Sequence, residues 1–176
     1  MKGPKTLAGV LGKNSYASTI MYPYNPQEAF YFKVYNKIMT NFHASQIRHH
    51  FLDFDRAHFP ELAISIYNKT YKSVHDKDKP QLLQLVTLPN YELLKLATKN
   101  NVDLPFTIHP LALKAKLVQA NIVSERGDNV ENSTFAHITM EMICKSKEGS
   151  EVTQYNVFER RMDVKKKEAW RLALIE

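Results

Sequence analysis

The chain has 176 residues, of which 44% are hydrophobic and 24% are charged, which is ordinary for one globular domain with room for a core. No run of about 18 apolar residues occurs, so the sequence predicts no membrane-spanning helix. The single cysteine, Cys144, excludes an internal disulfide, and the fold must therefore rest on its core.

The net charge of +6 is concentrated in the first third of the chain. Of the 24 basic and 18 acidic residues, 6 and 1 lie in residues 1–52, which leaves 18 and 17 for the rest. A one-sided positive field attracts polyanions such as RNA or an acidic membrane surface, although the same charges could serve solubility alone. The candidate contacts to RNA or acidic lipid are the six cations of this part: Lys2, Lys5, Lys13, Lys33, Lys37 and Arg48.

Residues 1–24 are predicted to form a basic extended arm, and residues 25–176 one α+β domain. The arm contains three of the five glycines, and no acid precedes Glu28. Its composition is also typical of a mitochondrial transit segment, except that the first arginine is Arg48. A retained transit peptide and a binding arm both fit these residues.

The segment Asn25-Pro-Gln-Glu28 has a capping asparagine, a proline at the first helical position and a glutamate three residues after the cap. It predicts a helix from there to about Phe51. Large apolar residues form one row and a second row beside it: Phe30, Val34, Ile38 and Phe42, then Tyr31, Tyr35 and Met39. We expect this face to pack into the core, with a partner-binding face as the alternative.

Prolines divide the next segment into short helices. Pro60 opens a helix that ends near Asp76, Pro80 opens a shorter one, and Pro89 restarts the chain in a helix to about Lys99. The side chains expected to point inward are Leu62, Ala63, Ile66, Tyr67, Val74, Leu82, Leu83, Val86, Leu93, Leu94 and Ala97.

After Pro105 the hydrophobic period changes to two, which predicts strands. Leu113, Ala115 and Leu117 alternate with lysines in the first strand, and 138–144 form the second. Residues 152–161 form the third, and 170–175 the fourth. Helices followed by hairpin-spaced strands predict an α+β fold, with the helices packed on one face of a curved antiparallel sheet of about four strands.

The sequence gives little support for catalysis. It has no nucleotide-binding glycine loop and no nucleophile elbow, and Cys144 shares a strand face with methionines, as a buried inert thiol would. The histidine-rich segment from His49 to His58 matches no standard zinc spacing. Tyr91, His109, His137 and Tyr155 could line a cone-shaped cavity, but His137 lies opposite the apolar face of its strand. We predict no enzyme activity, no cofactor and no metal.

Two stretches resemble a mitochondrial domain family. Tyr155-Asn-Val-Phe-Glu-Arg160, a basic turn and Trp170-Arg-Leu172 resemble its closing hairpin. Residues 67–94 and 110–122 follow the layout of its ribosomal member. The family includes the large-subunit ribosomal protein "L forty-five", its fungal inner-membrane ribosome receptor relative and the import-motor tether "Tim forty-four".

The resemblance covers about residues 60–176 and implies a cone-like domain without catalytic residues. It implies a place in the mitochondrial matrix, near the tunnel exit of the large ribosomal subunit. The implied partners are ribosomal RNA, mitoribosomal proteins and the inner-membrane surface, with no small-molecule substrate. A tether or accessory subunit of another inner-membrane complex, such as the protein import motor, is the alternative.

Overall fold

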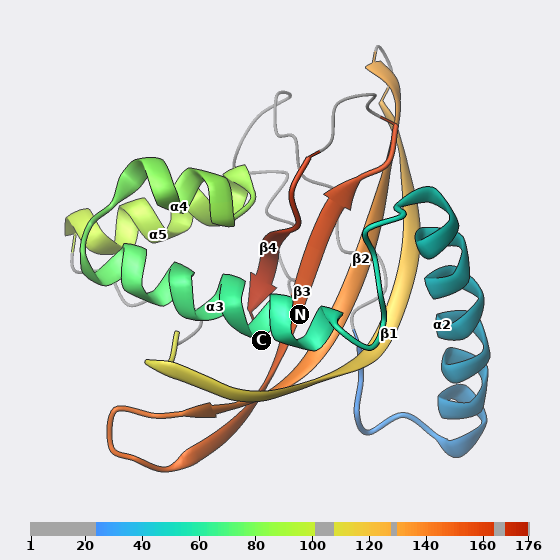
Figure 1. The fold of residues 1–176 in the computed structure, drawn as a ribbon, viewed down its shortest axis with the longest axis horizontal. Helices are drawn as coiled ribbons and strands as arrows, with labels where there is room; N and C mark the ends of the chain where they lie inside the picture. The colour runs from blue at the N-terminus through green and yellow to red at the C-terminus, as the bar shows by residue number, and fades with distance from the viewer. Residues whose placement is uncertain (1–23, 101–107, 128–129, 164–167, 176) are drawn as a thin grey trace, which may run out of the picture.

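The structure, a computed structural model, describes residues 24–100, 108–127, 130–163 and 168–175. Within these residues four helices precede four strands (Figure 1). Their bounds are α2 Phe30–His50, α3 Phe59–His75, α4 Lys79–Leu85, α5 Leu88–Asn100, β1 Leu111–Gly127, β2 Val130–Lys145, β3 Glu151–Arg161 and β4 Arg171–Ile175.

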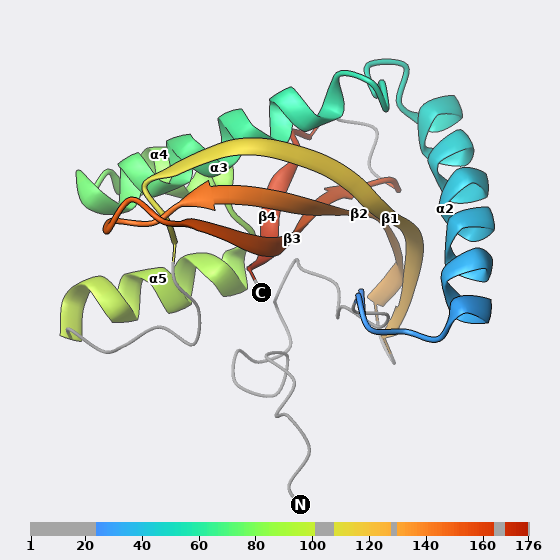
Figure 2. The same ribbon diagram turned by 90° about the horizontal axis from the view of Figure 1, so that it is seen from below.

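The four strands form one antiparallel sheet in the order β1-β2-β3-β4. The pairing of β1 with β2 shifts register between Ala112 and Lys114 and again between Leu117 and Gln119. Extra residues of this kind bend a strand, and β1 arches over the sheet in Figure 2. The predicted class, an α+β fold with amino-terminal helices and a curved sheet, is therefore confirmed.

Helix α3 covers one face of the sheet and closes the core (Figure 2). Alternation along β2 turns one set of its side chains toward α3, and all of these are fully buried: Ile138, Met140, Met142 and Cys144. Phe59, at the start of α3, meets Trp170 edge-on with ring centroids 4.9 Å apart. The predicted inward residues of β2, and the burial of Cys144, are confirmed.

One buried hydroxyl links α3 to the sheet. Tyr67 donates to Oε1 of Gln154 at 2.7 Å and accepts from the backbone N–H of His109 at 2.9 Å. Tyr67 is wholly buried, and this burial raises the pKa of its phenol. The hydroxyl thus joins α3, β3 and the segment that leads into β1.

Helix side chains satisfy backbone groups on the free edge of β1. The backbone N–H of Ala112 donates to Oδ1 of Asn68 at 2.8 Å, and the side-chain amide of Asn68 donates to the Ala112 carbonyl oxygen at 3.4 Å. Further along, Ala120 donates to the Thr40 hydroxyl at 3.4 Å, and its carbonyl oxygen lies 3.0 Å from Nδ1 of His43. An open edge invites pairing with other strands, so α2 and α3 protect β1 from such pairing.

The connection between α4 and α5 lies against β4. Val86 forms a parallel bridge with Leu172. The carbonyl oxygen of Leu172 accepts from the Thr87 N–H at 3.0 Å and from the Asn90 side chain at 3.1 Å. The predicted proline-started helices are confirmed here, and Asp78 caps α4 by accepting from the Gln81 N–H at 3.1 Å.

The predicted start of the first helix is wrong by several residues. Asn25 does accept from the N–H of Gln27, at 2.9 Å, but the cap serves an isolated turn. Ala29 has an extended ψ of 151°, which separates this turn from α2. A capping pattern specifies a local turn, and the residue after it decides whether a helix follows.

Two leucines that were predicted to point inward are exposed instead, and so is Leu113 of the alternating pattern in β1. Leu62, Leu83 and Leu113 are 43%, 43% and 39% exposed. For Leu113 the reason is the register shift beside it, which breaks the alternation along β1. Leu62 and Leu83 are each next to a buried residue, Ala63 and Leu82, and one step turns a helix by about 100°, so they lie beside the buried side of their helices.

Candidate macromolecular interface on helix α2

Helix α2 buries only one narrow side. We call this side the inner seam: Thr40, Ala44, Ile47 and, directly after the helix, Phe51. Ile47 is 0% exposed and Phe51 is 9% exposed. The spacing of four, three and four residues keeps the inner seam on one line along the helix, and this line faces β1.

Of the seven apolar residues of α2 that were predicted to pack into the core, all but the half-buried Met39 are exposed, so this prediction is wrong. Phe30, Phe32 and Val34 are 82%, 56% and 42% exposed. A line of four further residues, the outer seam, is also exposed: Tyr31 75%, Tyr35 53%, Ile38 61% and Phe42 55%. Scattered apolar residues on a surface need no explanation, but a contiguous patch marks a binding surface.

The two seams lie on nearly opposite sides of α2. Ile38 precedes Thr40 by two positions, and Phe42 precedes Ala44 by two positions. Two steps of about 100° place such neighbours about 200° apart around a helix. The sheet therefore covers the inner seam, and no element in the described part of the chain covers the outer one (Figure 2).

The charge of α2 has a single sign. Its 21 residues contain no acid, and Lys33, Lys37 and Arg48 are all exposed. These are three of the six predicted contact residues; Lys2, Lys5 and Lys13 lie outside the described residues. Exposed cations can hold phosphates, and a basic surface can also receive an acidic protein partner.

A buried arginine anchors the end of α2 to the sheet. Arg160 of β3 is 3% exposed and donates to both carboxylate oxygens of Asp53 at 3.1 Å. Its guanidinium also lies 4.0 Å from the centre of the Phe51 ring. These contacts hold α2 in place, so its outer seam is presented on a fixed support.

The histidine-rich segment after α2 forms local pairs. Nδ1 of His58 lies 2.8 Å from Oδ2 of Asp55. The hydrogen bond to Asp55 raises the pKa of His58. The pKa of Asp55 is lowered, first by the hydrogen bond from the Ala57 N–H and second by the hydrogen bond with His58. No three His, Cys, Asp or Glu side chains come together as a metal site within the described ranges.

The candidate catalytic residues do not converge: Tyr91 lines a cavity that none of the other three lines. The backbone of His109 binds Tyr67 on the core side, whereas Tyr155 donates to Glu141 at 3.2 Å on the other face. His137 is on the face opposite Cys144, as predicted, but it is buried rather than at the surface. Its Nε2 lies 2.8 Å from Oε2 of Glu159, and the only cysteine faces away from this pair.

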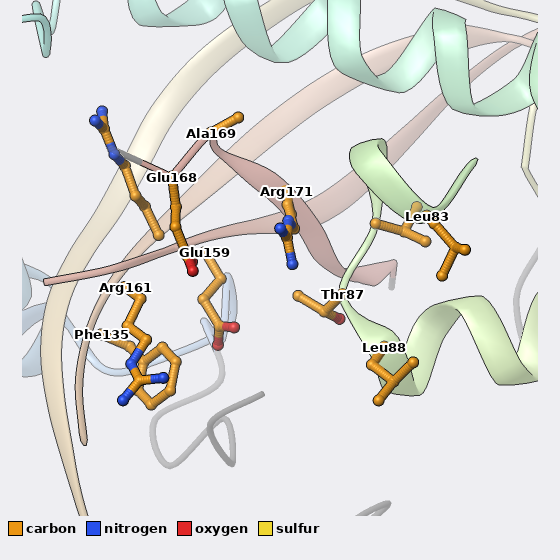
Figure 3. Close-up of a pocket in the computed structure, with 11 residues that line it drawn as sticks. Leu83, Thr87, Leu88, Phe135, Glu159, Arg161, Glu168, Ala169 and Arg171 are labelled. Carbon is orange, nitrogen blue, oxygen red and sulfur yellow. The ribbon is translucent and has the colours of Figure 1, made fainter. Parts of the chain in front are cut away.

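A cavity of about 370 Å³ lies beside β4 (Figure 3). Arg171 and Glu159 point into it from the sheet, Thr87 from the α4–α5 connection and Leu88 from the start of α5. Glu159 is already bound to His137, while the Thr87 hydroxyl and Nε of Arg171 are buried without hydrogen-bond partners. These groups include no nucleophile paired with a base, so the arrangement offers polar contacts and no evident chemistry.

Three further lysines lie together in the structure, although the sequence did not indicate that they form a cluster. Lys77, Lys79 and Lys95 surround a cavity of about 320 Å³ whose floor includes Leu82 and Tyr91. Lys95 also pairs with Glu92 at 3.4 Å. Lys95 lies 16 positions after Lys79 in the sequence, and only the packing of α4 and α5 brings it to the other two lysines. They lie in the part of the sequence whose charges nearly balance.

None of the helices in the described residues combines the length and the apolar composition that a bilayer crossing requires. No protein-family model matches the chain, and no curated protein is detectably similar to it in sequence.

Proposed function

We propose that this chain is a structural protein of the mitochondrial large ribosomal subunit, located near the tunnel exit on the matrix side. There it binds ribosomal RNA and neighbouring ribosomal proteins and can face the inner membrane. It carries out no catalysis and takes no cofactor. The observation that carries the proposal is the charge of α2, whose 21 residues contain exposed cations and no acid.

The placement of the resembling segments supports the proposal. Residues 155–160 and 170–172 lie on β3 and β4, which are adjacent and antiparallel, with Phe158 opposite Leu172. A closing hairpin of this form is what the resemblance to the ribosomal family implies. The curved sheet with amino-terminal helices agrees with the same family.

Fractionation of mitochondria on a sucrose gradient, followed by detection of this chain, tests the location. We expect the chain in the fractions that hold large-subunit RNA, under gentle salt. If it sediments away from that RNA, the proposal fails. Binding to cardiolipin-containing vesicles without ribosome association would instead support a tether of another inner-membrane complex, because the cations of α2 can also attract acidic lipid.

Salt titration of RNA binding tests the role of the cations. Replacing Lys33, Lys37 and Arg48 with glutamine should weaken binding to large-subunit RNA and make it less dependent on salt, because each phosphate contact releases counterions. A matched control removes the same charge elsewhere, at the exposed Lys69, Lys72 and Lys147. If the two triple variants bind equally, the RNA contact does not depend on α2.

A further inference from the structure

We infer that the outer seam of α2 is a docking site for one acidic amphipathic helix of a neighbouring protein. The inference rests on the proposed function, in that it names the kind of protein neighbour that α2 receives. It is carried by the spacing of the outer seam, by its exposure and by the charge of the helix around it.

The spacing of the outer seam suits a helix. Tyr31, Tyr35, Ile38 and Phe42 follow one another after four, three and four residues. This is the interval at which side chains of one helix fit between those of a second helix that runs alongside. All four are more than half exposed, so the ridge is formed and unoccupied within the described chain.

The charge of α2 selects the partner. Arg48 lies beside the line of the outer seam, at a position from which paired helices form ion pairs with each other. Lys37 lies on the same side of the helix as Arg48 but farther from the outer seam. No acid occurs anywhere on the helix. A partner with acids along its flank gains attraction, whereas a basic partner is repelled.

The same charge argues against a second copy of this chain. Pairing two α2 helices through their outer seams would bring Lys37 and Arg48 near their own counterparts or near neutral residues. No opposite charge is available on α2 to compensate. A two-fold contact uses the same patch on both partners, so it would bring cations together with no acid of α2 between them.

The seam itself is better suited to a helix than to RNA or lipid. Lys33 lies on the inner-seam side of α2, because it precedes Thr40 by seven residues, so it is turned away from the outer rings. On the other flank lie Phe32, Met39 and Gln46, which supply no cation. Phosphates and anionic lipids would require cations close to the rings or along both flanks.

Two designed peptides test the inference. Each has four heptads with leucine at the seam positions; one carries glutamate at the flanking positions and the other lysine. We expect the full chain to bind the glutamate peptide in fluorescence anisotropy and to bind the lysine peptide at least tenfold more weakly. Equal binding to both peptides, or to neither, would overturn the inference.

Variants locate the contact. The double variant Tyr35→Ser, Ile38→Ser should weaken binding of the glutamate peptide at least tenfold. Leu52→Ser is the matched control, because Leu52 is 93% exposed just beyond the helix and outside the seam. Arg48→Glu should weaken the glutamate peptide and strengthen the lysine peptide. Unchanged binding in the double variant would place the contact elsewhere.

Further arms separate this inference from the proposed function. If the chain associates with the large subunit but the double variant associates equally, the docking inference fails and the proposed function stands. If the peptide binds as expected but the chain is absent from ribosomal fractions, the proposed function fails and the docking inference stands. A double variant that loses large-subunit RNA or cardiolipin vesicles while retaining the peptide would also overturn the docking inference.

Discussion

Arg160 and Asp53 join the central sheet to the connection between α2 and α3 through two hydrogen bonds of 3.1 Å. The arginine is buried and the side chain of Asp53 is 49% exposed, so water reaches only the acid. Arg160→Ala should lower the free energy of unfolding by about 3 kcal/mol, toward the low end for a broken buried pair. Urea denaturation measures this loss.

The control for Arg160 lies in the same connection. Arg56 is exposed and donates to Asn41. Its replacement by alanine should change the unfolding free energy by no more than about 0.5 kcal/mol. Equal urea midpoints for the two variants would show that the contacts of Arg160 do not stabilise the fold.

The two seams of α2 predict opposite results for one substitution. Ile47→Ala should cost about 2–5 kcal/mol, because it removes a fully buried side chain from the contact with the sheet. Ile38→Ala, on the same helix but 61% exposed, should cost under about 1 kcal/mol. Urea unfolding of both variants checks the orientation of α2, and the opposite order would mean that the outer seam is the buried one.

The hydroxyl of Tyr67 is predicted to matter more than its ring surface alone. Tyr67→Phe removes the donor to Gln154 and the acceptor for the His109 N–H, both within the core. Leaving buried polar groups unpaired costs about 1–3 kcal/mol. Thermal or urea unfolding measures the cost. No change would indicate that water replaces the hydroxyl.

Cys144 should be unreactive in the folded protein. It is fully buried, and burial raises the pKa of its thiol, so the reactive thiolate is scarce at neutral pH. Labelling with a thiol-specific reagent should follow urea unfolding. A matched control places a thiol at the exposed turn of the same hairpin, Ser150→Cys in a Cys144→Ala background, and should react at once.

The Asp55–His58 pair should be strongest between the two pKa values. The pKa of His58 is raised, so its contribution to stability is complete below the ordinary value of 6.5 and is lost as pH rises through the folded value. The pKa of Asp55 is lowered, so its contribution is present above 3.8 and is lost as pH falls through the folded value.

An NMR titration of the histidine ring signals measures this pairing. Asp55→Asn should bring the pKa of His58 down toward its ordinary value, because the hydrogen bond to Asp55 is the main cause of the shift. Asp76→Asn, an exposed acid elsewhere on the surface, should leave the titration of His58 unchanged. A His58 titration identical in both variants would contradict the pairing.

Local signals were sufficient for much of the fold. Prolines marked where α3, α4 and α5 begin, and the alternation in β2 identified the four fully buried residues Ile138, Met140, Met142 and Cys144. These features depend on backbone preferences and on period alone. The positions of the cations on α2 were also readable, because charge needs no knowledge of packing.

The orientation of α2 could not be read in the same way. Ile38 and Ile47 are identical residues on two stripes of one helix, and periodicity does not say which stripe meets the sheet. The deciding contacts are with Ala120, far along the chain. One signal was present: apolar residues occupy opposite sides of α2, and a helix on the edge of a sheet buries only one of them.

The carbonyl oxygen of Leu172 receives Thr87 and Asn90, residues that precede it by more than 80 positions. A chain is synthesised from its amino end, so α3, α4 and α5 emerge long before the strand that fastens them. During that interval the apolar sides of these helices lack their cover, and they are open to aggregation or to chaperones. The helices are therefore protected from aggregation only after β4 has been synthesised and has docked against them.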